Sequence, residues 1–319
     1  MSLPSEVLYC SICIQVLHLV VQSESRGLIC LQTAECTVRE KPIDALYCTV
    51  SVFFSVFAIP RSQRRYCTMS LSNDNVYESQ QSLNEYLDLH YSNALRNLPP
   101  TMDHALFFPQ RVGQLLIKLC DTYESALDIG GSVGGTALEL ANNFDHVDSF
   151  DFSHQFIETA QRLQQGESLE FQVRTEGDAT TTATVPSFSD HLKNKIRFFQ
   201  GDACQMPSIP ELSGKTYNAI VLANLLCRLP NPQACLTSVA SLLQTGGVVL
   251  IVTPFTWLEH YTPREHWIIE SGDSLTSLQQ RMQALGFQQI HDEDMPLLIR
   301  EHTRKYQYII SKATWWKKL

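Results

Sequence analysis

The chain has 319 residues, a length that suits two domains or one large domain with extensions. Hydrophobic residues make up 44% and charged residues 18% of the sequence, which excludes an intrinsically disordered chain. The formal net charge is -9 and no long run of Lys or Arg occurs, which argues against nucleic acid or another extended polyanion as a partner. A small cationic or zwitterionic ligand is compatible with this charge.

The first 68 residues differ from the rest of the chain in charge. They carry six Lys or Arg against five Asp or Glu, so the remaining residues carry 18 against 28. The apolar runs 7–21 and 45–60 are too short to span a bilayer, and the first lacks the basic start of a secretory signal. We expect residues 1–68 to be a poorly ordered leader, outside the functional protein, and Met69 to be its natural start.

The cysteines are also concentrated in this first segment, which holds six of the ten. Cys10 and Cys13 form a single C-x-x-C pair with no second pair at zinc-finger spacing, so no metal site is predicted. The other four cysteines are scattered over the rest of the chain, as reduced core thiols are.

From residue 69 onward the hydrophobic pattern alternates between helix and strand. It predicts helices over 79–91, 110–120, 136–142, 153–163, 233–243 and 275–285. It predicts strands over 125–129, 146–150, 196–199, 219–223 and 248–253, and a closing antiparallel pair over 287–301 and 306–310. Residues 166–194, which are rich in Gln, Glu, Thr and Ser, are predicted to be an insertion or mobile loop. Parallel crossovers followed by a hairpin predict a Rossmann-like, doubly wound α/β fold with a mostly parallel seven-stranded sheet.

A glycine-rich segment, 130–135, separates the first predicted strand of this sheet from a helix. Gly130 permits a sharp turn, and Asp151 ends the next strand 21 positions later. This is the offset at which an acidic side chain accepts hydrogen bonds from ribose hydroxyls. Because ligands of such sheets bind beyond the carboxyl ends of the strands, the pattern indicates a nucleoside ligand.

The spacing of these glycines distinguishes between nucleoside cofactors. Ser132 occupies the second position of the dinucleotide fingerprint, which leaves the pattern D-x-G-x-S-x-G from Asp128 to Gly134. This pattern resembles motif I of the S-adenosylmethionine-dependent methyltransferases. The resemblance implies S-adenosyl-L-methionine as cofactor and the following cofactor-binding residues: Asp128, Gly130, Gly131, Ser132, Gly134, Asp151, Phe152, Asp202, Ala203 and Asn224. A loop or cap acid is the alternative for Asp202, and a turn-stabilising acid the alternative for Asp128.

A narrower resemblance depends on three segments outside this common core. They are Glu-Tyr-Leu-Asp-Leu-His-Tyr at 85–91, Ala-Asn-Leu-Leu-Cys-Arg-Leu-Pro at 223–230 and Thr-Pro-Phe-Thr-Trp-Leu-Glu at 253–259. Together they resemble the 4-mercaptohistidine N-methyltransferases, the family that forms the C-terminal domain of ovothiol-synthesis proteins. The resemblance covers about residues 76–316, within a class I methyltransferase domain expected over 69–319. It implies methyl transfer to an imidazole nitrogen of mercaptohistidine, the last step toward ovothiol.

The same resemblance suggests which side chains handle the acceptor. The predicted catalytic residues are His90, Tyr91, Arg228 and Glu259, and the predicted substrate-binding residues are Tyr86, Arg111, Phe255, Trp257 and Arg264. An Arg would pair both oxygens of the substrate carboxylate, and Arg228 is favoured because it directly follows the fourth strand. Glu259 would hold the α-amino group, the aromatic residues would surround the imidazole and meet the sulfonium, and His90 is the best proton acceptor if one is needed. Surface ion pairs, a core Tyr86 and a structural His90 are the alternatives.

Two alternatives to this function remain at this stage. An enzyme of the same fold could methylate another small acceptor, and the chain could be a non-catalytic, cofactor-binding regulatory protein. The H-x-x-x-H-x-E pattern of an iron-dependent sulfoxide synthase is absent, so we expect separate pathway proteins to supply mercaptohistidine. The expected partner is a small-molecule amino-acid substrate, without nucleic acid, membrane or metal, in the cytoplasm.

Overall fold

The computed structural model describes residues 35–37, 49–51, 75–92, 98 and 100–319. Contacts divide the chain into two units, Met1–Ser72 and Asn73–Leu319. In the first unit, β1 (Glu35–Thr37) pairs antiparallel with β2 (Thr49–Ser51). The other parts of the expected leader, including the C-x-x-C pair and the proposed start, lie outside the described residues.

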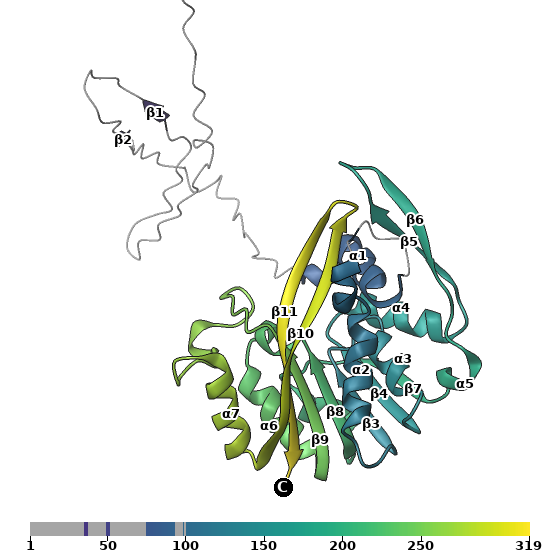
Figure 1. The fold of residues 1–319 in the computed structure, drawn as a ribbon, viewed down its shortest axis with the longest axis vertical. Coiled ribbons are helices and arrows are strands. Elements are labelled where there is room, and N and C mark those ends of the chain that lie inside the picture. Colours follow the sequence, from purple (N-terminus) through teal and green to yellow (C-terminus); the bar gives the residue numbers. More distant parts are fainter. Residues whose placement is uncertain (1–34, 38–48, 52–74, 93–97, 99) are drawn as a thin grey trace, which may run out of the picture. The chain divides into compact units, whose positions relative to one another are not determined.

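The second unit is built on a seven-stranded sheet (Figure 1). In chain order its strands are β3 (Ser125–Ile129), β4 (His146–Asp151), β7 (Ile196–Gln200), β8 (Tyr217–Ala223), β9 (Leu243–Thr253), β10 (Phe287–His302) and β11 (Lys305–Lys318). The order across the sheet is β7-β4-β3-β8-β9-β11-β10. Neighbours from β7 to β9 are parallel, whereas β11 runs antiparallel to both β9 and β10. This confirms the predicted Rossmann-like, doubly wound sheet with a C-terminal antiparallel hairpin.

The helices lie close to their predicted positions. The long ones are α1 (Gln80–Tyr91), α2 (Phe108–Lys118), α4 (His154–Gln164), α6 (Pro232–Leu242) and α7 (Ser274–Ala284), and the short α3 spans Gly135–Leu140. Ser153 caps α4 as expected, because its Oγ accepts a hydrogen bond from the Phe156 N–H at 3.2 Å. Gly286 follows α7 with a φ of +85°, a backbone conformation that glycine adopts without strain. None of the helices in the described ranges is long and apolar enough to cross a membrane.

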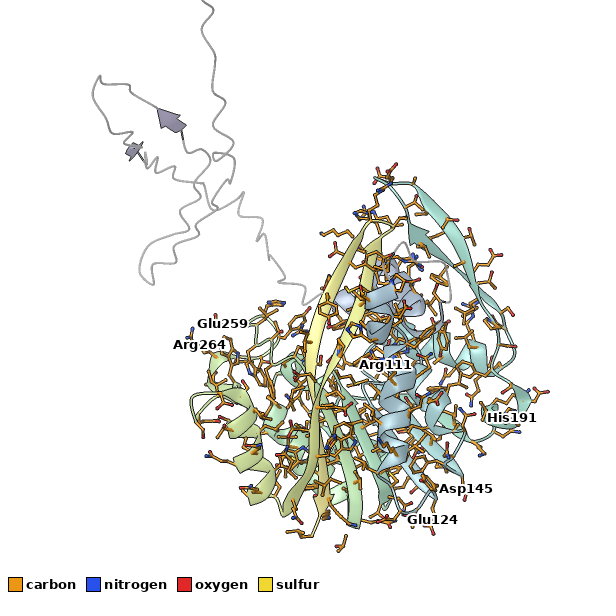
Figure 2. All side chains as sticks on the ribbon, viewed as in Figure 1. Arg111, Glu124, Asp145, His191, Glu259 and Arg264 are labelled. Atoms are coloured by element: carbon orange, nitrogen blue, oxygen red, sulfur yellow. The ribbon has the colours of Figure 1, made fainter. Side chains whose placement is uncertain are left out.

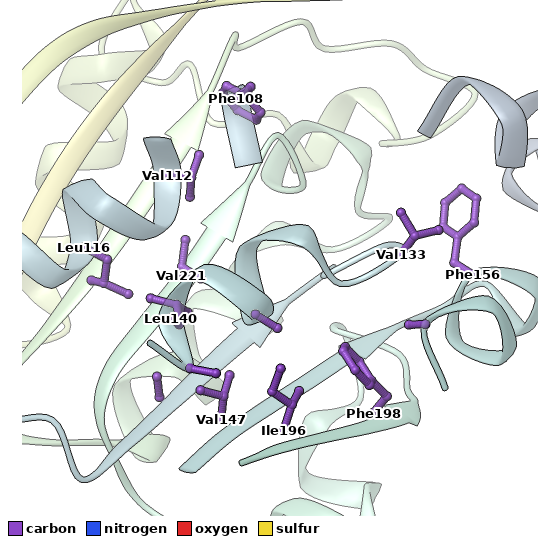
Figure 3. Close-up of a cluster of buried hydrophobic side chains, with 14 of the residues drawn as sticks. Phe108, Val112, Leu116, Val133, Leu140, Val147, Phe156, Ile196, Phe198 and Val221 are labelled. Carbon is purple, nitrogen blue, oxygen red and sulfur yellow. The ribbon is translucent and has the colours of Figure 1, made fainter. Parts of the chain in front are cut away.

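The helices cover the two faces of the sheet and enclose two hydrophobic clusters. Alternate residues of a strand point to opposite faces, so Val221 belongs to the first cluster and Ile220 to the second. Residues of α1, α2, α3 and α4 join the first cluster, part of which Figure 3 shows, whereas residues of α6 and α7 join the second. The helices that follow β3 and β4 therefore cover one face, and those that follow β8 and β9 cover the other, so the sheet divides between the neighbouring strands β3 and β8. This is the topological switch point, beyond which ligands of such sheets bind.

The segment predicted as an insertion or mobile loop is an ordered hairpin. It contains β5 (Leu169–Arg174), β6 (Thr180–Val185) and the short α5 (Asp190–Lys193), and β5 pairs with β6 in a separate two-stranded sheet. Leu169, Phe171 and Val173 are buried in strict alternation with exposed polar residues. The hairpin is compatible with the insertion alternative, but its strands were not predicted because the polar composition concealed this period of two, which identifies a half-buried strand.

The C-terminal strand also differs from its prediction. It was expected over 306–310, but β11 continues to Lys318 and pairs with β9 through Lys317. Trp315 and Trp316 explain the extension, because each is fully buried and each joins a different one of the two clusters. The polar pair Ser311-Lys312 obscured this continuation in the sequence.

Beyond the sheet, α1 stands between the β5–β6 hairpin and the outer part of β10 (Figure 1). Asp88 of α1 forms an ion pair with Arg300 of β10, and both side chains are only 5% exposed. Breaking such a pair leaves a buried charge and is costly, about 3–5 kcal/mol. The N-terminal helix is therefore anchored to the C-terminal hairpin, and it holds its inward side chains over the switch point.

Candidate cofactor and acceptor site

The glycine-rich turn after β3 is shaped by its backbone. Gly130, Ser132 and Gly134 have φ values of +74°, +51° and +91°. A Cβ on Gly131 would lie 2.1 Å from Ser149 Oγ, and one on Gly134 would lie 2.7 Å from the Phe198 ring. The turn therefore requires glycine at these two positions to pack against the protein itself.

Asp151, at the end of β4, joins this turn to the next helix. Its Oδ2 accepts a hydrogen bond from the Ser132 N–H and its Oδ1 accepts one from the Ser153 N–H, both at 2.9 Å. Burial is the main cause that raises the pKa of Asp151 to about 6. A carboxylate offers about four acceptor positions, so Asp151 retains capacity for two further donors such as ribose hydroxyls.

Asp128 lies beneath the turn. It is 1% exposed, its Oδ2 accepts a hydrogen bond from Ser149 Oγ at 3.3 Å, and burial raises its pKa to about 7. A Cβ on Gly131 would lie 2.7 Å from the same Oδ2. This position favours the turn-stabilising alternative for Asp128 over direct cofactor contact.

The turn also contains an unpaired polar atom. Ser132 Oγ is buried and has no hydrogen-bond partner in the structure. Such a group is costly unless a ligand or water completes it. With the free capacity of Asp151 nearby, these residues fit the polar ribose and amino-acid portions of S-adenosyl-L-methionine.

The other predicted cofactor residues come from neighbouring strand ends. Phe152 follows β4 and is 59% exposed, so its ring is available to an adenine face. Asp202 follows β7 and accepts hydrogen bonds from the Cys204 N–H at 2.8 Å and Gln205 Nε2 at 2.9 Å, which identifies it as the cap of its own turn. Ala203 in that turn is buried. Contact of these residues with cofactor remains a prediction.

Asn224 directly follows β8, on the other side of the switch point. It is a non-glycine residue with a φ of +53°, and its Oδ1 accepts a hydrogen bond from Ser311 Oγ at 2.8 Å. Its N–H donates to the Val252 carbonyl at 2.7 Å. Non-glycine residues with a left-handed backbone conformation are uncommon, and they are concentrated at ligand-binding sites. Asn224 is thus fixed at the strand end where the cofactor prediction places it.

Two of the predicted catalytic residues, His90 and Tyr91, support the turn from α1. His90 Nδ1 accepts a hydrogen bond from the Gly135 N–H at 3.0 Å, and the Tyr91 hydroxyl donates to the Val133 carbonyl at 2.6 Å. Burial lowers the pKa of His90 to about 3 and raises that of Tyr91. His90 is therefore neutral with its Nδ1 lone pair occupied, which corrects the expectation that it accepts a proton. Its position matches the structural alternative.

Tyr86 belongs to an aromatic group beside Asp151. Its ring centroid lies 5.0 Å from that of Phe156 and 6.0 Å from that of Tyr77. Burial, followed by the charge of Asp151, raises the pKa of Tyr86 to about 12, so its hydroxyl stays protonated. Tyr86 is thus half-buried near the Asp151 carboxylate. Tyr77, which the residue predictions omitted, completes this wall.

Arg228 connects the segments that follow β8 and β9. Its Nη1 donates to the Cys227 carbonyl at 3.1 Å and to the Thr256 carbonyl at 2.9 Å. Its guanidinium lies 4.9 Å from the ring centroid of Tyr261, which in turn stacks on Tyr77 at 6.4 Å. Tyr261 is a second residue that the sequence did not identify, because it lies in a loop without periodicity. Arg228 keeps donors that these carbonyls do not use.

Three other predicted residues do not converge on this point. Arg111, on α2, donates to the backbone carbonyls of Leu106 and Pro296, and burial lowers its pKa. Arg264 and Glu259 form a 3.6 Å ion pair with side chains 75% and 65% exposed. Figure 2 shows this pair side by side on the loop beyond β9, well apart from Arg111. These contacts favour the surface and structural alternatives, and contact of these residues with substrate remains a prediction.

Phe255 and Trp257 lie by a cavity of about 400 Å³ at the end of β9. Phe255 lines it, with a φ of +52° and its N–H donating to Thr253 Oγ1 at 3.2 Å. Trp257 Nε1 donates to the Oγ of Ser274, another lining residue, at 2.9 Å. Both predicted substrate-binding aromatics therefore lie next to a space of ligand size.

The fold and the site together define a doubly wound protein whose switch point carries a glycine-rich turn, Asp151 and Asn224 at neighbouring strand ends. Among the residues that the structure describes, no three His, Cys, Asp or Glu side chains are grouped to hold a metal ion. Residues 102–292 match the profile of the family described as Methyltransferase domain. The chain belongs to this family. It is an S-adenosylmethionine-dependent methyltransferase, and its cofactor is S-adenosyl-L-methionine.

Solved structures of similar proteins include the YcgJ protein of Bacillus subtilis, which is 16% identical with a TM-score of 0.43, over 65% of this chain and 98% of that chain. Magnesium protoporphyrin IX methyltransferase of Synechocystis with bound SAM is 14% identical with a TM-score of 0.48, over 77% of this chain and 94% of that chain. An S-adenosylmethionine-dependent methyltransferase of Methanosarcina mazei is 16% identical with a TM-score of 0.43, over 70% and 99%. No curated protein matches the sequence. Similarities this low do not identify the acceptor.

Proposed function

We propose that this methyltransferase transfers the methyl group of S-adenosyl-L-methionine to an imidazole nitrogen of mercaptohistidine. The observation that carries the proposal is where the two most specific segments of the narrower resemblance meet. Residues 223–230 and 253–259 follow neighbouring strands, β8 and β9, at the switch point, and Arg228 bonds to the Thr256 carbonyl at 2.9 Å. The segments that resemble the mercaptohistidine enzymes thus lie side by side, and they would form one wall of the proposed substrate crevice.

The cofactor half of this crevice has its own residues. Asp151 would accept hydrogen bonds from the ribose hydroxyls, and Ser132 Oγ would gain the partner it lacks. Phe152 and Asp202 would flank the adenine. Bound there, S-adenosyl-L-methionine supplies an electrophilic methyl group on a sulfonium. Tyr91 and His90 fix the turn from α1, so the residues that would hold the cofactor stand on a braced backbone.

The reaction needs little acid or base chemistry. S-adenosyl-L-methionine would supply the methyl group, and a neutral imidazole nitrogen of the acceptor would take it with its lone pair while the electrons of the C–S bond stay on sulfur. The ring would then carry the positive charge and lose a proton to solvent. Holding the two reactants in line contributes about 7–11 kcal/mol. The tyrosine wall around Tyr86 would stabilise the moving cation by about 0.5–2 kcal/mol.

The test uses the full chain with S-adenosyl-L-methionine and, separately, mercaptohistidine, histidine or no acceptor. Mass spectrometry follows S-adenosylhomocysteine and a gain of one methyl group on the acceptor. A gain confined to mercaptohistidine supports the proposal. A gain on histidine alone would favour the other-acceptor alternative, and cofactor binding without any product would favour a regulatory protein. We also propose that separate proteins supply mercaptohistidine and that the reaction takes place in the cytoplasm.

A further inference from the structure

The cavity at the end of β9 combines an aromatic wall with charges of both signs. Phe255 and Ile310 contribute apolar surface, and Asp273, Asp294 and Lys312 contribute charge. Its volume of about 400 Å³ is in the range of small-molecule sites. The lining residues come from the loop after β9, the start of α7, β10 and β11, so four separate segments converge on it.

The position of this cavity follows from strand register. Lys312 pairs with Thr253 across β11 and β9, and Asp294 pairs with Lys312 across β10 and β11. Ala223 of β8 pairs with Val252, so Asn224 stands at the level of Thr253. With strands spaced about 4.8 Å apart, Lys312 lies on the order of 10 Å from the end of β8. The cavity is therefore beside the switch-point crevice, at the same edge of the sheet.

The charges are arranged as adjacent opposites. Lys312 Nζ lies 2.6 Å from Asp294 Oδ1 and 3.4 Å from Asp292 Oδ1, and its side chain is 26% exposed. Asp273 adds a second carboxylate to the cavity wall. An adjacent cation and anion, each still open to solvent, are complementary to the carboxylate and ammonium of one α-amino acid. A purely anionic ligand would meet three carboxylates, those of Asp273, Asp292 and Asp294, for one ammonium.

We propose that this cavity binds the amino-acid head group of the methyl acceptor, with Lys312 at its carboxylate and Asp294 at its ammonium. This inference rests on the proposed function and specifies which side chains recognise the α-amino and carboxylate groups of the substrate. It assigns to Lys312 the carboxylate contact that was expected of an arginine, with Arg228 favoured, and to Asp294 the ammonium contact that was expected of Glu259. Phe255 would then separate the head group from the imidazole that faces the cofactor.

The experiment compares acceptors that lack one charge. The full chain and its Lys312→Met and Asp294→Asn variants are assayed with mercaptohistidine, its decarboxylated analogue and its deaminated analogue. Lys317→Met is the matched control, because Lys317 lies on the same strand but pairs with the exposed Asp121 at 3.2 Å. Thermal unfolding of each variant establishes that it is folded. The measured quantity is the ratio of kcat/KM between the intact acceptor and each analogue.

Removing one charge-assisted contact lowers kcat/KM about tenfold or more. We expect Lys312→Met to abolish the preference of the wild type for mercaptohistidine over the decarboxylated analogue, and to leave transfer to that analogue unchanged. Asp294→Asn should do the same for the deaminated analogue, and Lys317→Met should alter neither ratio.

Two results would overturn the inference while leaving the proposed function intact. One is a wild type that transfers methyl to mercaptohistidine without discriminating against either analogue. The other is a pair of variants that lower kcat/KM equally for all acceptors, as a structural role would. A wild type inactive on mercaptohistidine would instead overturn the proposed function, and this inference with it.

Discussion

His90 is expected to make a contribution to the stability of this fold that is lost as the pH falls below 7. Its side chain is buried, and its Nδ1 accepts the Gly135 N–H at 3.0 Å. Burial lowers its pKa from 6.5 to about 3. In the unfolded chain His90 therefore binds a proton near pH 6.5, whereas in the folded chain it stays neutral. Protonation thus favours the unfolded state, and His90 lowers the free energy of unfolding as the pH falls from 7.

Between pH 7 and pH 5 this loss amounts to about 2 kcal/mol, at about 1.36 kcal/mol for each pKa unit. Because the folded pKa lies well below 5, the figure depends on the unfolded pKa and hardly on the folded one. Asp128 and Asp151 act in the opposite direction, since burial raises their pKa values to about 7 and about 6. They bind protons in the folded state and offset the loss, so the contribution of His90 must be isolated by substitution.

His90→Asn retains an acceptor near the position of Nδ1 and removes the titration. Denaturant unfolding of the wild type and the variant is measured at pH 7 and at pH 5. We expect the variant to lose about 2 kcal/mol less than the wild type over this range. His191→Asn, at an exposed position of α5, should follow the wild type. Equal pH dependence of wild type and His90→Asn would refute the reasoning.

Three further predictions concern the cofactor and acceptor halves of the site. Asp151→Asn should weaken cofactor binding about tenfold. The wild type should lose cofactor affinity as the pH falls through about 6, because the Asp151 carboxyl then binds a proton. Calorimetry should show that the variant lacks this pH dependence. Gly134→Ala should lower the Tm by several degrees, because a φ of +91° costs about 1–2 kcal/mol in an alanine and the added Cβ meets the Phe198 ring; an unchanged Tm would contradict the geometry of the turn. Arg228→Ala should raise the KM for the acceptor, because it removes a charged hydrogen-bond donor from the proposed acceptor half. The cofactor Kd should stay within about twofold. A larger change in the cofactor Kd would place Arg228 in the cofactor half.

The sheet could be predicted because its signals are local. The strand at 125–129 has both bounds as expected, since an apolar run ends at a glycine that must turn. The β5–β6 hairpin was missed because its inward residues alternate with Glu, Gln and Arg, and composition outweighed period. The length of β11 was missed because only pairing with β9, which is distant in sequence, shows that the strand continues beyond Lys312.

The site divides in the same way. Asp151, Ser132 and Asn224 could be placed because each stands next to a predicted strand or turn. Arg111 could not, since one of its carbonyl partners, Pro296, lies 185 positions away and no local pattern indicates it. The role of His90 depends on a backbone N–H that only the packing of α1 against the turn brings near.

The two halves of the site differ in what holds them in place. The cofactor half is built around a backbone turn, fixed by glycines that the protein interior requires at 131 and 134. A change there disturbs the fold before it alters specificity. The proposed acceptor half consists of loops after β8 and β9, joined by Arg228, and loops can vary on a fixed scaffold. On this proposal the glycine turn indicates the cofactor, whereas residues 225–230 and 253–259 indicate the acceptor. For this reason the acceptor assay tests only the acceptor inferred from those two loops, and a negative result would leave the methyltransferase assignment unchanged.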